Sequence, residues 1–345
     1  MNSSKAVVHE KHKKHENNQE HAILLAFARR MSETPLQQSF CSCLSCFSWT
    51  RFGLIALSLV VVFGANGVRA EVSVQDDSGA TLRLKEPARR IVSLAPHVTE
   101  TLYAAGAGAQ LVGAVDYSDY PEAAKRVVRI GGYSKLDLET IVALKPDLAI
   151  GWASGNLPAH IAKLRALGIP VYLTQPARID DIANDLERFG EIAGTQTTAR
   201  AAAASFRTRL QELRSRYGAR PKLRVFYQIW KQPLMTVGSG QIIGDAIRLC
   251  GGENVFGDVN TLAPKVTVEA VLAANPEVIV ASGMGEARPD WLDDWRQWNS
   301  MTAVKRDNLF FIPPDLIQRH TPRIVEGTES LCKQLETARA RMGKS

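Results

Sequence analysis

Ser93 and His97 are the residues of this sequence whose types and spacing come nearest to a catalytic pair. A serine hydroxyl beside an imidazole base is a common way for an enzyme to make a nucleophile. Ser93, however, lies in the apolar run 90–94 without the glycines of a nucleophile elbow, and no acidic residue is placed to orient His97. We therefore interpret Ser93 as a helix-capping residue and His97 as a surface or cleft histidine, and we expect no catalytic site.

The histidines do not form a metal-binding pattern either. Beyond residue 70 the sequence has His97, His160 and His320, far apart and without HxxxH or HExxH spacing. Zinc and manganese sites usually gather several histidines and carboxylates. A Walker motif and a GxGxxG turn after a strand are also missing from the sequence. We expect no metal site and no cofactor.

Aromatic side chains are the positive signal for binding. Tyr117 follows a predicted strand at 111–115, Tyr133 precedes a predicted helix, and Trp152 and Trp230 end predicted strands. In open α/β sheets, ligands bind beyond the carboxyl ends of the strands. Packing within a loop would explain any one of these rings. Several of them, drawn from both halves of the chain, favour a broad, flat, largely apolar ligand in a cleft.

Asp315 and Arg319 add polar groups to the same kind of position. They follow a predicted strand at 309–312, again at its carboxyl end. There they could form hydrogen bonds with the polar edges of a ligand. The alternative is a surface ion pair four residues apart, which contributes little to stability.

A thirteen-residue pattern shows how these side chains are positioned. Residues 138–150 recur as residues 268–280, with Glu, Ala and Pro at the same offsets. Each copy predicts a short helix, a proline that ends it, and a wholly apolar strand suited to a sheet covered on both faces. Chance would also produce such a pair, because helix–proline–strand is common in α/β proteins. We favour duplication, which predicts two α/β lobes with parallel sheets and a cleft.

The rest of the sequence predicts the other strands and helices of the two lobes. It predicts a hairpin over 71–86, strands at 90–94, 147–152, 170–174 and 223–230, and helices at 97–107, 137–145, 157–167, 241–251, 290–300 and 322–342. Between the lobes, residues 179–192 and 195–217 predict two helices, the second about 35 Å long. The expected division is therefore an N-terminal lobe at 71–177, connecting helices at 178–218 and a C-terminal lobe at 219–345. A rigid connecting helix predicts small lobe motion.

The first 70 residues are expected to be a leader. The apolar run 54–63 is shorter than the ~20 residues that span a bilayer, and Val68-Arg69-Ala70 suits signal-peptidase cleavage. Met31 is an alternative start, and a short uncleaved anchor is an alternative fate. We expect a mature periplasmic protein that begins near Glu71.

Charge and cysteine content agree with export. The chain has 42 Lys and Arg against 35 Asp and Glu, but eight of the former and four of the latter lie in the leader, which leaves a net charge of +3. A nucleic-acid surface needs a basic stripe, so we expect no such partner. Only Cys250 and Cys332 follow the leader. They can pair in an oxidising compartment, or they can remain two buried thiols.

Beyond these patterns, the sequence resembles the periplasmic solute-binding proteins of iron-siderophore, haem and cobalamin ABC importers, and most of all their cobalamin-binding members. The resemblance covers about residues 88–340. It rests on the stretches 117–121, 138–148, 151–156, 250–256, 315–319 and 321–324.

The resemblance implies a class III fold, with two Rossmann-like lobes joined by one long helix and the ligand between them. It assigns Tyr117 and Trp152 to the aromatic walls, and Asp315 and Arg319 to the corrin side chains. It also implies a disulfide between Cys250 and Cys332, and it assigns Glu139 and Glu269 to arginines on an inner-membrane permease dimer that works with an ATPase. We expect a monomer that binds cobalamin or a related corrinoid.

Two departures from the family keep other ligands open. Members of the family carry tryptophan where this sequence has Tyr133 and Ala263. Tyrosine can still stack on a ligand, but Ala263 cannot, so that wall is weakened or is supplied by Trp230. Haem or an iron-siderophore is therefore the alternative ligand. For haem, Tyr117 or Tyr120 would be the axial oxygen ligand.

Overall fold

The structure is a computed structural model that describes residues 71–343 except 133–134, 284 and 286. The predicted leader, the proposed cleavage site and Tyr133 lie outside the described residues. Contacts between Cα atoms group residues 66–345 into one compact unit. Within the described part of the chain, no helix has the length and apolar character needed to cross a bilayer.

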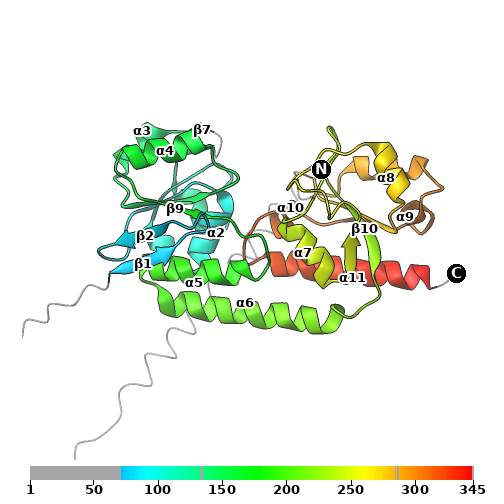
Figure 1. The fold of residues 1–345 in the computed structure, drawn as a ribbon. Coiled ribbons are helices and arrows are strands. Elements are labelled where there is room, and N and C mark those ends of the chain that lie inside the picture. The colour runs from blue at the N-terminus through cyan, green and yellow to red at the C-terminus, as the bar shows by residue number, and fades with distance from the viewer. Residues whose placement is uncertain (1–70, 133–134, 284, 286, 344–345) are drawn as a thin grey trace, which may run out of the picture. The chain divides into compact units, whose positions relative to one another are not determined.

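The first half of this unit is built on a five-stranded parallel sheet (Figure 1). Its order is β5 (Val128–Arg129), β4 (Leu111–Ala114), β3 (Ile91–Ser93), β8 (Leu148–Trp152) and β9 (Val171–Thr174). Buried side chains of α2 (Pro96–Ala104) and α5 (Asp181–Ala193) pack on one face. Those of α3 (Leu138–Ala143) and α4 (Pro158–Ala166) pack on the other. Because both faces are covered, the central strands are apolar throughout.

The second half repeats this plan. Its sheet has the order β11 (Met235–Thr236), β10 (Leu223–Trp230), β13 (Val278–Ala281) and β14 (Leu309–Phe311), with β12 (Gly252–Asn254) also paired to β10. All these pairings are parallel except that of β10 with β11. Helices α7 (Ile242–Leu249) and α11 (Ile324–Met342) contribute to one core. Helices α8 (Val268–Ala274) and α9 (Thr302–Lys305) contribute to the other. Two α/β lobes with largely parallel sheets are thus confirmed.

The duplicated segments fold alike at both of their ends. Asp137 caps α3 by accepting a hydrogen bond from the amide of Thr140, at 3.0 Å. Thr267 caps α8 in the same way. The helices are followed by Lys145 and Asn275, 130 residues apart, which both have positive φ angles, 46° and 40°. Side chains other than glycine rarely adopt that conformation, so its recurrence at the same offset supports duplication.

Equivalent hydrogen bonds are found at the end of the helix in both copies. Arg90 donates side-chain hydrogen bonds to the carbonyl of Leu144, at the end of α3. Arg224 does the same for Ala274, at the end of α8. Each arginine's own amide donates to an acid that opens the following strand, Asp147 or Glu277. Helix ends leave carbonyls unpaired, and both copies satisfy one of them with an arginine.

The two lobes are joined by one long helix that runs along both of them (Figure 1). Helix α5 ends at Gly194, whose φ of 74° lets the chain reverse. Helix α6 (Gln196–Tyr217) follows, with 22 residues that span about 33 Å. It packs against α5 and α11 (Figure 1). One continuous hydrophobic cluster includes side chains of α2, α5, α6, α7 and α11, so the connecting helix is part of the core. The exact boundaries of the lobes stay a prediction.

Shorter elements complete the fold. A hairpin of β1 (Val72–Gln75) and β2 (Thr81–Leu84) confirms the one expected at 71–86. The other short elements are β6 (Gly131–Gly132), β7 (Lys135–Leu136), α10 (Pro314–Ile317) and 3₁₀ helices at Gly108–Gln110 and Glu122–Arg126. They were not predicted, because two to five residues show no period.

Three local predictions were wrong. The segment expected as a helix over 290–300 is a 3₁₀ helix, Asp290–Gln297. It is rich in Asp and Trp, which favour α-helix weakly, and Trp295 is fixed by a 2.7 Å hydrogen bond to Gln228. The last helix begins at Ile324, because Pro322 lies in the turn before it. Ser93 does not cap α2. Its hydroxyl donates to the carbonyl of Ala95, which is the N-cap residue.

The expected disulfide is present. Cys250 follows α7 and Cys332 lies within α11, with their Cα atoms 4.7 Å apart and their sulfurs bonded. Both residues are fully buried. The alternative of two buried free thiols is wrong.

Candidate functional site

A cavity of about 210 Å³ lies where the carboxyl ends of β8 and β9 meet the second lobe. From the first lobe it is lined by Trp152, Ser154, Gln175 and Pro176. From the second it is lined by residues 240–242, Leu262, Ala263 and His320. The prediction that a cleft between the lobes receives the end of strand β8 agrees with this geometry. Ala263, the residue expected to weaken a wall, also borders the cavity.

Trp152 is held at the cavity by its own loop. The amide of Trp152 donates to Asn156 Oδ1 at 2.7 Å, and Asn156 Nδ2 donates to the carbonyl of Leu94 at 2.9 Å. A Cβ on Gly155 would lie 1.8 Å from the indole ring. Glycine is therefore required there for the half-buried ring to take this position.

Two histidines pack against Trp152. The ring centroids of His97 and His320 lie 5.2 and 5.8 Å from that of Trp152, and 5.4 Å from each other. Each of the three residues buries one ring nitrogen that has no hydrogen-bond partner in the described structure: His97 Nε2, Trp152 Nε1 and His320 Nδ1. Buried polar atoms are nearly always paired, and here three unpaired ones lie within one set of touching rings.

Both imidazoles are neutral near pH 7. Burial lowers the pKa of His320 to about 4. Burial also lowers the pKa of His97 well below its usual value, and the neighbouring His320 and Arg319 lower it further. A neutral imidazole carries one nitrogen lone pair that can accept a hydrogen bond or bind a metal.

Arg319 joins the lobes beside this cluster. Its Nη1 donates to Asp119 Oδ1 at 2.6 Å, and its Nε lies 3.1 Å from Asp315 Oδ1. Burial alone would raise the pKa of Asp119, but the hydrogen bond and charge of Arg319 lower it overall. Asp315 and Arg319 are therefore paired as neighbours, and Arg319 also reaches the Tyr117–Pro121 loop of the first lobe.

A second arginine makes a parallel link. Arg323 donates to both carboxylate oxygens of Glu100 at 2.7 Å, and its guanidinium carbon lies 3.9 Å from the ring centroid of Tyr120. The Glu100 side chain is only 3% exposed. This is a bidentate, desolvated pair, the stronger kind of ionic contact.

The other predicted aromatics lie outside the cavity. Tyr117 is 75% exposed, with a positive φ of 63°. Trp230 is 37% exposed, and its indole nitrogen donates to the carbonyl of Gln232. Neither is among the described residues that line the cavity. Their roles in binding stay a prediction, and Tyr133 lies outside the described residues.

Glu139 and Glu269 occupy equivalent places. Each is the second residue of its helix, α3 or α8, and each is solvent-exposed. The hydrogen bonds with its own amide and with Thr267 lower the pKa of Glu269. Both carboxylates are accessible to a partner, although acids are favoured near helix starts in any case.

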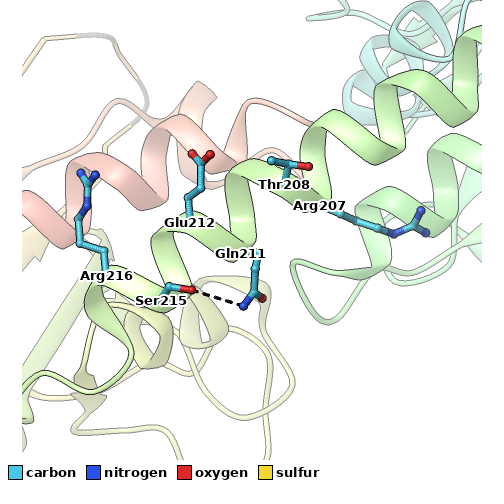
Figure 2. Close-up of a pocket in the computed structure, with 6 residues that line it drawn as sticks. All are labelled: Arg207, Thr208, Gln211, Glu212, Ser215 and Arg216. Atoms are coloured by element: carbon cyan, nitrogen blue, oxygen red, sulfur yellow. Dashed lines mark hydrogen bonds between the residues drawn. The ribbon is translucent and has the colours of Figure 1, made fainter.

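A further hollow runs along α6. Figure 2 shows the six described residues that line it, all from this one helix: Arg207, Thr208, Gln211, Glu212, Ser215 and Arg216. A single helix face does not converge on a ligand from several sides. Ligand sites are concave and combine groups from different elements, so the cavity at Trp152 is the better candidate.

Catalytic and metal chemistry find no support in the described geometry. The Ser93 hydroxyl accepts a hydrogen bond from Thr99 and donates to a carbonyl, so it does not face His97 as a nucleophile would. Among residues 71–343 as described, no group of three His, Cys, Asp or Glu side chains could hold a metal ion.

Sequence reasoning missed five residues of this site: Glu100, Asp119 and Arg323 as partners across the lobes, and His97 and His320 as neighbours of Trp152. Their contacts join residues up to 223 positions apart. No spacing rule connects such positions. The sole signal was that Asp119 and Arg323 lie in the stretches that carry the family resemblance.

Comparison with known proteins agrees with this architecture. The profile of the periplasmic binding protein family matches residues 91–316. The vitamin B12-binding protein of Vibrio cholerae is 39% identical over 253 residues, which are 73% of this chain and 91% of that protein. The vitamin B12-binding protein of Yersinia pestis is 36% identical over 250 residues, 72% of this chain and 87% of that protein.

Solved structures give the same result. The crystal structure of the periplasmic vitamin B12 binding protein of Vibrio cholerae superposes with a TM-score of 0.68 at 38% identity, over 73% of this chain and 98% of that one. The periplasmic haem-binding protein of Roseiflexus in its apo form gives 0.62 at 22% identity, over 73% and 99%. The second likeness shows the shared fold alone.

Proposed function

The chain belongs to the periplasmic binding protein family, and from this premise we propose that it captures cobalamin or a related corrinoid for an ABC importer. The observation that carries the ligand class is the 39% identity to a vitamin B12-binding protein over 91% of that protein's length. The cavity at the strand ends, with Trp152 on its wall, supplies a site of the right kind. In this proposal the protein binds and delivers its ligand without chemical change.

The ligand lies in the cleft that contains the cavity of about 210 Å³. That volume is below the roughly 300–1,000 Å³ of small-molecule pockets, and a corrinoid is large. We therefore infer that the lobes separate on binding. Two contacts cross between the lobes, Arg319 with Asp119 and Arg323 with Glu100, and such a motion would have to loosen both. Because α6 belongs to the common core, the motion is small.

Each predicted site residue has a role in this proposal. Trp152 stacks on one face of the macrocycle, and Tyr117, Tyr133 and Trp230 contribute at its margins. Asp315 and Arg319 form hydrogen bonds with polar side chains of the corrinoid. Arg319 is 17% exposed and Asp315 is 31% exposed, so both are accessible from the cleft once the lobes part.

Membership of the periplasmic binding protein family supports a proposal for export and delivery. We infer that the leader is removed after Ala70 and that the mature monomer works in the periplasm. N-terminal sequencing of the exported protein should begin near Glu71, and finding residues 41–46 on exported protein would contradict this.

The mature protein then docks on an inner-membrane permease dimer coupled to its ATPase, through Glu139 and Glu269. Nucleic acid is not a partner in this proposal.

The ligand is tested with the mature protein, residues 71–345. Isothermal calorimetry with cyanocobalamin should give one site per chain, and hemin should bind more weakly or not at all. The visible spectrum of each mixture, compared with free ligand, provides an independent measurement. If the protein binds hemin but not cyanocobalamin, haem is its ligand and the corrinoid proposal is wrong. If it binds only a ferric siderophore, its ligand belongs to that class.

A further inference from the structure

The cluster of His97, Trp152 and His320 has polar atoms that nothing in the described structure satisfies. One ring nitrogen of each residue is buried without a hydrogen-bond partner. His97 and His320 are 6% and 8% exposed. Leaving a buried polar atom unpaired is costly, so a partner from outside the chain that paired with atoms of these touching rings would be stabilised by them.

His320 is the member of the pair that faces the ligand cavity. Together with Trp152 it lines the cavity, whereas His97 packs behind both rings. Its backbone is held on both sides. Arg319 is fixed by Asp119 and Asp315, and the amide of Thr321 donates to the carbonyl of Arg319. The imidazole therefore projects from a rigid turn, as a ligand-binding group should.

The chemistry of a neutral imidazole restricts what this partner is. Two histidines alone do not make a site for a free divalent ion, which requires three or four protein ligands, and the described residues offer no third ligand. A metal held at the centre of a macrocycle is different. Its four equatorial positions are already filled by ring nitrogens, so a single axial nitrogen from the protein completes the site.

We propose that His320 supplies an axial nitrogen to the cobalt of a corrinoid bound in this cleft, with His97 as a positioning residue behind it. The inference rests on the proposed function and deepens it. It names the preferred ligand as a corrinoid with an exchangeable axial position, such as one that lacks its own nucleotide base. The imidazole lone pair forms the cobalt–nitrogen bond, and the displaced water leaves for solvent. The imidazole is already neutral, so no proton is released and cobalt keeps its oxidation state.

The test uses diaquacobinamide as the probe, because water occupies both of its axial positions. Bound to the wild-type mature protein, its visible bands should shift to those of the adduct formed when free imidazole is added to diaquacobinamide alone. His320→Ala should abolish the shift. His160→Ala is the matched control, since His160 lies on α4 and does not line the cavity, and it should leave the shift unchanged.

A second ligand separates this inference from the proposed function. Cyanocobalamin has both axial positions filled, so His320→Ala should weaken its binding less than it weakens the binding of diaquacobinamide. The circular dichroism spectrum of the variant, compared with that of the wild type, shows whether the variant is folded. Affinity for diaquacobinamide should fall at least tenfold in the same variant. Binding of both corrinoids with unshifted bands, or a shift that survives His320→Ala, overturns the axial assignment alone. Binding of neither corrinoid overturns the proposed function and this assignment together.

Discussion

Arg323 and Glu100, 223 residues apart, form a bidentate ion pair that ties the start of α11 to α2. Both hydrogen bonds are 2.7 Å long, and the ring of Tyr120 covers the guanidinium. The carboxylate is 3% exposed and the guanidinium 17%. The pair is thus taken out of water, and removing one member leaves a charge with nothing to balance it.

Arg323→Met should therefore lower the free energy of unfolding by about 3–5 kcal/mol, the scale for breaking a buried ion pair. Adding Glu100→Leu to the same protein should recover part of that loss, because the uncompensated charge is removed. Urea denaturation measures both. Glu122→Ala is the control, since its pair with Lys125 is exposed and its loss should leave the free energy of unfolding almost unchanged. Similar losses for the single and double variants would mean that packing, not charge, matters at Arg323.

Asp185 predicts a pH-dependent stability. It is buried beneath β9, where the hydroxyl of Thr174 donates to it at 2.6 Å. Burial raises the pKa of Asp185 to about 7, above the value of about 3.9 in an unfolded chain. Between these values the folded state holds a proton that the unfolded state releases. The contribution of this proton to the free energy of unfolding is complete below about pH 4. It is lost as the pH rises through about 7.

Asp185→Asn keeps an oxygen that can accept from Thr174 and removes the titration. From pH 5 to pH 8 the wild type should lose about 2–3 kcal/mol more of its free energy of unfolding than the variant does, at roughly 1.4 kcal/mol per pKa unit. Urea denaturation of both proteins at pH 5 and at pH 8 measures this difference in the free energy of unfolding. The lowered pKa values of His97 and His320 act in the opposite direction, but they are common to both proteins. Identical pH profiles would refute the raised pKa.

The disulfide should account for a large part of the stability. Cys250 and Cys332 are 82 residues apart, and closing a loop of that length contributes roughly 4–5 kcal/mol in the chain-entropy model. The variant with both cysteines replaced by alanine should lose about that much free energy of unfolding. Thiol labelling of the denatured, unreduced mature protein should modify no cysteine, and labelling after reduction should modify two. Two labelled thiols before reduction would contradict the bond.

The sequence was sufficient for most of the architecture. The apolar strand 147–152 and the proline at 146 indicated β8 and its helix, because a strand covered on both faces has no polar positions. The repeat at 268–280 then predicted the second lobe by analogy. Residues 290–297 were misjudged as an α-helix because Trp291, Trp295 and Trp298 are spaced four and three apart, as on one face of an α-helix. These side chains do belong to the second core, but the turns that carry them are 3₁₀.

The candidate site was predicted less completely. Trp152 could be placed from its position at a strand end, and the pairing of Asp315 with Arg319 from their spacing. The partnership of Arg319 with Asp119, 200 residues away, depends on how the lobes face each other. The same holds for His320, which meets Trp152 only because α10 and α11 bring it there. Local pattern carries no information about such contacts.

Trp152 should contribute more to ligand affinity than Tyr117 or Trp230, because among these three described aromatics its ring lines the cavity. Trp152→Ala should weaken cyanocobalamin binding by about 2 kcal/mol, or roughly 30-fold, the scale of a buried aromatic hot spot. Trp152→Phe keeps a stacking surface and should lose much less. Trp230→Ala, at an exposed position, should weaken the free energy of cyanocobalamin binding by less than about 1 kcal/mol. Calorimetry measures all three, and equal losses for Trp152→Ala and Trp230→Ala would move the site toward β10.

Glu139 and Glu269 should matter for transport and not for ligand binding. They hold the same position in the two copies of the repeat, at the exposed starts of α3 and α8. Two equivalent acids suit a permease dimer whose two-fold symmetry presents the same arginine twice. Charges at such an interface mainly steer association and set register, and neither acid lines the cavity.

The variant with Glu139→Ala and Glu269→Ala should therefore bind cyanocobalamin with nearly unchanged affinity in calorimetry. Uptake of labelled cobalamin by cells that carry the cognate transporter should fall sharply, and further than for either single change, since one acid can still orient the complex. Glu253→Ala, at an exposed position of β12, is the matched surface control. A parallel loss of affinity and uptake would mean that the two acids shape the cleft. Normal uptake by the double variant would mean that they only stabilise the starts of their helices.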